Sequence, residues 1–297
     1  METYISIVVP YFNRIHYLKQ LIDSVHNYAD MPFELLVHDD ASVDGSTPEV
    51  FSLRDKMSVF IIGTGHNVGL PTATNRLVNI ARSNFIIFLN ADCVLNSPCL
   101  KKIVDILSKP YIGCLFLSNS TLNKPYIKTL SGAEFNLSGI GDGCAIAFRK
   151  EVWKEVGGWD EEVHSGVSDV VFVIRILLNG YFLVYPYEKR FVDNLSLLLQ
   201  KNKDSSMCAS GYDASYSKIF KLSNFDKECK NREEMVNKRA NSLINVEASI
   251  TNLGYWRSYL SNLGVDKGVK SINWDVAKKH GQDRWKDIMI KEELTSE

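Results

Sequence analysis

The chain has 297 residues, of which 45% are hydrophobic, so it is long enough to fold around one large core with a sizeable appendage. Its 34 basic and 35 acidic residues leave a formal net charge of −1. This balance gives no electrostatic case for nucleic acid or an anionic membrane as the main partner.

Cysteine usage and hydropathy bear on the compartment in which the chain works. The apolar neighbours of Cys114 and Cys144 favour buried thiols in a reducing compartment, and none of the six cysteines forms a CxxC pair. Residues 5–9 are too short for a signal peptide, and no apolar run approaches the roughly 18 residues that span a bilayer. We therefore expect a soluble, cytoplasmic protein without a transmembrane segment.

The first hundred residues alternate between apolar strands and amphipathic helices. Strands are predicted within residues 4–14, 33–42, 58–69 and 85–92, and helices around residues 18–25 and 71–82. This order predicts a parallel, doubly wound α/β sheet, in which ligands bind beyond the carboxyl ends of the strands.

Polar side chains stand where these strands are predicted to end: Asp39, Asp40, Asn90 and Asp92. Asp92 has an alternative role as a cap for the helix that follows it. Asn96 and Ser97 stand closer to the start of that helix, so we place Asp92 at the mouth of the expected ligand site.

The second half of the chain begins with further α/β elements and then changes in texture. Residues 141–162 predict a glycine-rich turn, a strand and a short helix, and residues 168–187 predict a helix followed by a strand. After Asn202 the segments become polar and helix-prone, with scattered aromatic residues. We place a domain boundary near residue 200, with one domain in residues 1–200 and a mainly helical region in residues 201–297.

Six short motifs follow one another within residues 4–195. They are Pro10-Tyr11-Phe12-Asn13; Asp39, Asp40, Ser42, Asp44, Gly45 and Ser46; Asn67, Gly69, Ala73 and Asn75; Asn90-Ala91-Asp92; Gly157 to Glu161; and Ser168, Asp169, Arg175, Gly180 and Tyr181. In this order and spacing they resemble the nucleotide-sugar glycosyltransferases of family 2. The resemblance implies the A-type (GT-A) fold, which has a Rossmann-like, mostly parallel central sheet flanked by helices, here with a C-terminal helical appendage.

The resemblance implies a donor site at the first motifs. Phe12 would stack on the nucleotide base and Asp40 would accept a hydrogen bond from an imide N–H of uracil or thymine. Other residues of the donor motifs are Pro10, Asn13, Asn67, Asn75 and Asn90. Two alternatives stay open: one of the acids Asp39 and Asp40 forms only a turn, and Phe12 belongs to the core.

The donor diphosphate requires a divalent cation, Mn²⁺ or Mg²⁺, held by hard oxygen ligands. Asp92 provides one such oxygen, whereas Asn90 replaces the first acid of the usual metal motif. Relatives often carry a late histidine near the metal. Asp193 stands at that position here and is a second candidate ligand.

The acceptor hydroxyl must lose a proton during transfer, and Asp169 is the candidate general base. Ser168 replaces the glutamate that usually precedes this acid. The alternative for Asp169 is an N-terminal helix cap, a position that also favours aspartate.

These features predict a glycosyltransferase that moves a sugar from a UDP or dTDP donor to a hydroxyl of a glycan or lipid-linked acceptor, and the resemblance further implies that the transfer is inverting. Residues 201–297 are expected to build part of the acceptor site. One alternative is a non-catalytic protein that binds sugar nucleotides or glycans on the same scaffold. Another is a transferase acting on modified DNA bases, which the neutral charge disfavours.

Overall fold

The structure is a computed structural model. It describes residues 4–63, 66–110, 112–120, 126–128, 132–137, 142–161, 168–179, 181–187, 189–196 and 294–295. The predicted helical region in residues 201–297 therefore lies outside the described residues, except for the two residues of the last strand. Among the described residues, no helix combines the length and the apolar character that a bilayer span requires.

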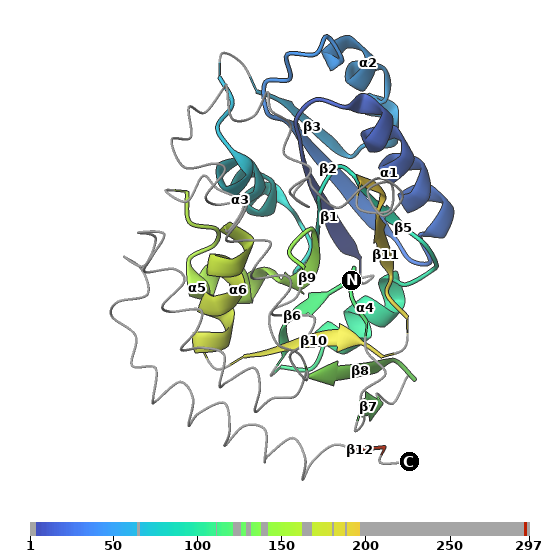
Figure 1. Cartoon of the computed structure of the whole chain (residues 1–297), viewed down its shortest axis with the longest axis vertical. Coiled ribbons are helices and arrows are strands. Elements are labelled where there is room, and N and C mark those ends of the chain that lie inside the picture. The colour runs from blue at the N-terminus through green and yellow to red at the C-terminus, as the bar shows by residue number, and fades with distance from the viewer. Residues whose placement is uncertain are drawn as a thin grey trace, which may run out of the picture.

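A ten-stranded mixed sheet forms the centre of the molecule (Figure 1), with strand order β12-β7-β8-β10-β6-β9-β4-β1-β2-β3. Its strands are β1 (Ile5–Tyr11), β2 (Phe33–Asp39), β3 (Val59–Ile62), β4 (Phe85–Leu89), β6 (Ile112–Phe116), β7 (Tyr126–Lys128), β8 (Glu134–Leu137), β9 (Ala145–Arg149), β10 (Phe182–Pro186) and β12 (Leu294–Thr295). A separate two-stranded sheet consists of β5 (Cys93–Leu95) and β11 (Val192–Asn194).

The sheet divides into a parallel part and a largely antiparallel part. Strands β3, β2, β1 and β4 are parallel, as the alternation of strands and helices predicted. β9 then lies antiparallel between β4 and β6, and β10 is parallel to β6. The edge strands β8, β7 and β12 are antiparallel to their neighbours. The predicted α/β class is confirmed. The reversal at β9 brings the residues that precede it to the carboxyl end of β4.

Helices cover both faces of this sheet, as Figure 1 shows. α1 (Ile15–Tyr28) and α4 (Leu100–Leu107) bury their apolar residues in one core cluster, together with inward residues of β1, β2 and β4. α3 (Leu70–Ile80), α5 (Lys150–Val156) and α6 (Ser168–Leu178) pack against the other face. The short α2 (Thr47–Ser52) and a 3₁₀ turn (Arg54–Lys56) connect β2 to β3.

The apolar spacing in the sequence explains why these helices dock. Leu18, Leu21, Ile22 and Val25 recur every three or four residues and are all buried. The cysteines of the described residues also lie mostly in the interior. Cys93, Cys99 and Cys114 are buried, Cys144 is half-buried, and all four are free. The expected buried thiol is confirmed for Cys114, whose pKa is raised by burial.

Asn75 ties the Gly-Gly-Trp-Asp-Glu segment to α3. Its Oδ1 accepts hydrogen bonds from Trp153 Nε1 (3.2 Å) and from the backbone N–H of Trp159 (3.0 Å). Its Nδ2 donates to the Trp159 carbonyl (2.9 Å) and to Glu161 (2.8 Å). The Trp159 ring stacks on Phe172 of α6, with ring centroids 3.9 Å apart. The buried Asn75 amide therefore links α3 to α5 and to Trp159, whose ring in turn contacts α6.

We predict that Asn75→Ala lowers the free energy of unfolding by about 3 kcal/mol, because it leaves several buried polar groups without partners. Asn79→Ala is the matched control, since Asn79 is exposed on the same helix and should change stability by less than about 0.5 kcal/mol. Urea denaturation of both variants measures the difference. Equal, small losses would contradict a structural role for the Asn75 amide.

Candidate active site

The loops after β1 and β2 are locked together by strained backbone and side-chain hydrogen bonds. Asn13, Arg14 and Ala41 have positive φ angles of 58°, 62° and 60°, which non-glycine residues seldom adopt. Asn13 joins the two loops, because its N–H donates to Ser42 Oγ (2.8 Å) and its Oδ1 accepts from the N–H of Val43 (2.9 Å). The expected donor residue Asn13 thus shapes the loop. Pro10 lies half-buried in β1 and Phe12 half-buried just after it.

A second link between these loops runs from Tyr11 to Asp44. Ser46 donates its hydroxyl proton to Asp44, so it accepts from the Tyr11 hydroxyl at 2.7 Å. Burial raises the pKa of Tyr11 to about 12, which keeps that proton in place. Burial opposes ionisation of Asp44, but hydrogen bonds from Ser46 and from the N–H of Arg14 outweigh it and lower the Asp44 pKa.

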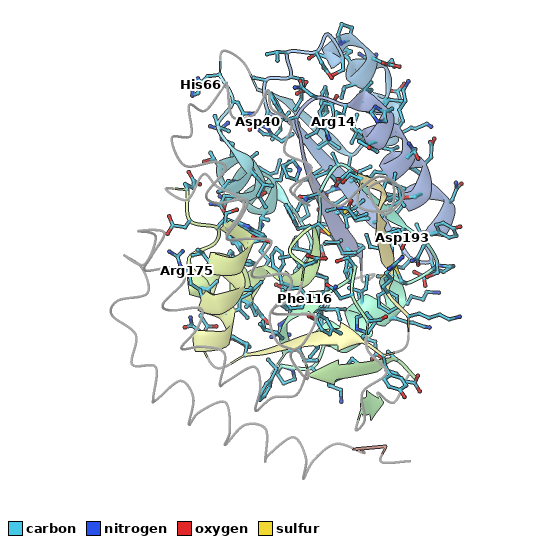
Figure 2. The ribbon with its side chains drawn as sticks, in the orientation of Figure 1. Arg14, Asp40, His66, Phe116, Arg175 and Asp193 are labelled. Atoms are coloured by element: carbon cyan, nitrogen blue, oxygen red, sulfur yellow. The ribbon has the colours of Figure 1, made fainter. Side chains whose placement is uncertain are left out.

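The two adjacent acids at the end of β2 have different surroundings. Asp39 accepts from the backbone N–H (3.0 Å) and hydroxyl (2.6 Å) of Ser42, so the turn alternative describes Asp39. Asp40 accepts from the backbone N–H groups of Val68 (2.8 Å) and Gly69 (2.9 Å), just before α3. Its pKa is raised by burial, against the effect of those N–H groups. Figure 2 places Asp40 near the carboxyl end of the parallel strands.

Two buried donors close to Asp40 have no hydrogen-bond partner within the described part of the chain. Asn67 uses Oδ1 to accept from the N–H of Gly69 (2.8 Å), but its Nδ2 is buried and unpaired there. His38 accepts at Nε2 from Arg76 (3.5 Å), which leaves a buried Nδ1 unpaired. His38 was not singled out in the sequence, since a lone histidine in a strand carries no pattern of its own.

Asp92 is held by the two-stranded β5–β11 ribbon. Ser196 Oγ donates to its Oδ2 at 2.5 Å, and Asn194 Nδ2 lies 3.4 Å from its Oδ1. The alternative that Asp92 caps the next helix is wrong, because Cys99 occupies the cap position of α4. Sequence reasoning missed Asn194 and Ser196, which become neighbours of Asp92 only through the pairing of β5 with β11.

Asp193 lies on the same strand but has a different partner. Its Oδ1 accepts from Arg190 Nε at 2.5 Å, and Figure 2 shows it on β11, on the α1 side of the sheet. The contacts to Asp92 come from the residue after it and from Ser196. A metal-binding role for Asp193 stays a prediction that this geometry does not favour. The same holds for Asn75 as a donor-binding residue, because both groups of its amide are already engaged.

Asp169 lies in the first turn of α6, packed against Gly143. A Cβ atom on residue 143 would lie 1.9 Å from Asp169 Oδ2. The next carbonyl, that of Cys144, accepts the N–H of Asn90 (2.8 Å). Asp169 is therefore linked, through Gly143 and the adjacent Cys144 carbonyl, to Asn90 in the segment that carries Asp92. The helix begins at Ser168, so Asp169 is already inside the first turn, where its negative charge interacts favourably with the helix dipole.

The donor set around Asp92 fits a cation that shares its ligands with phosphate. No group of three His, Cys, Asp or Glu side chains in the described ranges could hold a metal alone. Magnesium-type ions are commonly bound through one or two carboxylates together with substrate phosphates. One carboxylate, oriented by the amide group of Asn194 and the hydroxyl group of Ser196, matches that pattern.

The arrangement defines an α/β protein with acidic groups at the ends of parallel strands, and solved structures share its fold. Staphylococcus aureus TarS 1-349 in complex with UDP-GlcNAc superposes with a TM-score of 0.53 at 16% identity, covering 96% of this chain and 92% of that one. The mannosyltransferase PcManGT from Pyrobaculum calidifontis gives a TM-score of 0.52 at 16% identity, covering 93% and 85%. The predicted GT-A fold is confirmed.

The model of the family described as "Glycosyl transferase family 2" matches residues 6–157, about half of the chain, so the chain belongs to this family. Among curated relatives, the O-antigen biosynthesis protein RfbC of Myxococcus xanthus is 24% identical over 65% of this chain. The chondroitin synthase of Pasteurella multocida is 22% identical over 57%. The aligned segments make up only 17% and 18% of those relatives.

We predict that acid destabilises the fold partly through His38. Burial lowers the His38 pKa, with Arg76 acting in the same direction and Asp40 and Asp39 opposing. The unfolded chain therefore binds a proton more readily, and stability is lost as pH falls below the ordinary value of about 6.5. His38→Leu should lose less unfolding free energy than the parent between pH 7 and pH 5 in urea titrations. Identical losses in both proteins would contradict this.

Proposed function

We propose that the protein transfers a sugar from a nucleoside diphosphate to a hydroxyl group by single displacement with inversion. The observation that carries this proposal is the placement of three acids along one edge of the sheet. Asp40 follows β2, Asp92 follows β4, and Asp169 packs on Gly143, two residues before β9. The strands β2, β1, β4 and β9 are consecutive in the sheet, so the three acids lie in a row along its edge. The spacing between strands leaves each acid space for a different role.

The donor base is bound between Phe12 and Asp40 in this proposal. A carboxylate has about four lone-pair sites, so Asp40 can accept an imide N–H besides the N–H groups of Val68 and Gly69. This supports a uridine or deoxythymidine diphosphate sugar. One structural neighbour was solved with UDP-GlcNAc and another with GDP-Man, so the choice of base needs its own test.

A divalent cation, Mn²⁺ or Mg²⁺, would be held by Asp92 and would neutralise charge on the diphosphate leaving group. PcManGT was solved with Mn²⁺. Asn90 lies next to this position and adds no negative charge that would repel the diphosphate. The role of Asp92 is then to fix the diphosphate end of the donor at the carboxyl end of β4.

Asp169 would take the proton from the acceptor hydroxyl as the glycosidic bond forms. Its backbone position is fixed by α6, and its side chain is fixed against Gly143, so the carboxylate cannot swing away from this edge. The acceptor is proposed to be a glycan or lipid-linked sugar, with residues 201–297 contributing to its site.

For the donor, we predict that UDP stabilises the protein in the presence of Mg²⁺ and that GDP does not. At 100 times the dissociation constant, a bound ligand adds about 2.7 kcal/mol to the unfolding free energy. Thermal-shift titrations with UDP, dTDP, GDP and CDP measure this, with EDTA as the metal-free control. A larger shift with GDP than with UDP would overturn the assignment of Asp40.

For the base, we predict that Asp169→Asn lowers the transfer rate about 10²–10⁴-fold, because an amide cannot accept the proton. UDP affinity and folding should stay close to the parent's. Asp105→Asn on α4 is the control for loss of an acid on the other face of the sheet and should transfer normally. Normal transfer by Asp169→Asn would remove Asp169 as base. UDP binding without any transfer by the parent protein would favour the non-catalytic alternative.

A further inference from the structure

We propose that Asn194 and Ser196 position Asp92 for the cation, Asn194 through its Nδ2 and Ser196 through its hydroxyl group. This inference rests on the proposed function, since it concerns the cation that accompanies the donor diphosphate. It assigns to this chain a site built from one carboxylate, one amide and one hydroxyl. Asp92 immediately precedes β5, Asn194 ends β11 and Ser196 follows it, so the residues come from two segments about 100 positions apart in the sequence.

The three side chains form a closed set of contacts. Ser196 Oγ lies 2.5 Å from Asp92 Oδ2 and 2.9 Å from Asn194 Oδ1. Asn194 Nδ2 lies 3.4 Å from the other oxygen of Asp92. Ser196 is only 7% exposed, so its hydroxyl is dedicated to these partners. Both carboxylate oxygens of Asp92 are oriented by groups of β11 and the residues after it.

The backbone of the ribbon explains why these two residues face Asp92. Asn194 pairs with Cys93 in antiparallel register, and the N–H of Leu195 donates to the Asp92 carbonyl at 2.8 Å. Side chains alternate along a strand, so Asn194 faces Asp92 while Asp193 points away to Arg190. Ser196 follows the strand, in a helical turn that brings its hydroxyl to Asp92. The ribbon is anchored to α1, because the N–H of Leu95 donates to Ser24 Oγ at 3.0 Å.

The charge of this set determines its chemistry. Amide, hydroxyl and carboxylate oxygens are hard ligands that suit Mg²⁺ and Mn²⁺. A single negative charge binds a free divalent ion weakly, since affinity rises with the number of charged ligands. We therefore expect the free protein to bind Mn²⁺ weakly and the complex with UDP to bind it well.

The first test adds a charge. Asn194→Asp gives the set a second carboxylate beside Asp92, so binding of Mn²⁺ alone, followed by electron paramagnetic resonance, should tighten at least about tenfold. Asn79→Asp, which adds the same charge at an exposed position of α3, is the matched control and should leave Mn²⁺ affinity unchanged. A gain of affinity cannot arise from misfolding. Unchanged Mn²⁺ affinity in Asn194→Asp would overturn the proposal.

The second test removes the positioning hydroxyl. Ser196→Ala should weaken Mn²⁺-dependent UDP binding about 10–100-fold, the usual cost of losing a group that orients a metal ligand. Ser196→Thr, which keeps the hydroxyl, should restore it. UDP binding measured in EDTA should be the same in all variants. If Ser196→Ala lowers only the melting temperature and leaves Mn²⁺-dependent binding intact, Ser196 is merely structural and the inference fails.

These measurements separate the inference from the proposed function. A tighter Mn²⁺ site in Asn194→Asp with no sugar transfer by the parent protein would support the site and reject the enzyme. Sugar transfer by the parent protein, with Mn²⁺ affinity unchanged by either substitution, would support the enzyme and reject the site.

Discussion

Gly143 has no side chain, and the carboxyl group of Asp169 occupies the space where its Cβ atom would lie. This close approach is what places α6 over the entry to β9. Because β9 is antiparallel to β4, that entry lies at the carboxyl end of β4, and the Cys144 carbonyl bonds to Asn90 there. Any larger residue at 143 would separate the proposed base from the segment that carries Asp92. The row of acids therefore depends on one reversed strand and one missing side chain.

The motif residues have two physically different roles. Asn13, Asp39 and Asn75 form hydrogen bonds with other parts of the chain and so hold loops or helices together. Asp40, Asp92 and Asp169 are charged groups placed at ends of strands or at a helix start, where a ligand can approach. A family motif thus marks the framework of a site as much as its chemistry, because strained loops need such bonds to keep their shape.

The parallel half of the sheet could be predicted because each of its strands is a short apolar run followed by helical spacing. The same reading could not find the antiparallel position of β9, since strand direction is set by tertiary contacts. It placed Asp92 at a strand end correctly, yet chose Asp193 as its companion from sequence position alone. Side-chain alternation in β11 instead turns Asn194 toward Asp92, and the helical turn after the strand brings Ser196 to the same carboxylate. Pairing between segments 100 residues apart leaves no local periodicity to read.

Neutral polar residues lie next to both Asp92 and Asp169. Asn90 precedes Asp92 in the motif, Ser168 precedes Asp169, and Asn194 lies beside Asp92. Asn90 stands where relatives carry an acid, so one negative charge fewer lies beside the proposed diphosphate position, which lowers repulsion while a hydrogen-bonding group remains. In the proposed mechanism the two acids have separate tasks, because Asp92 would hold the cation and Asp169 would accept the proton of the acceptor hydroxyl.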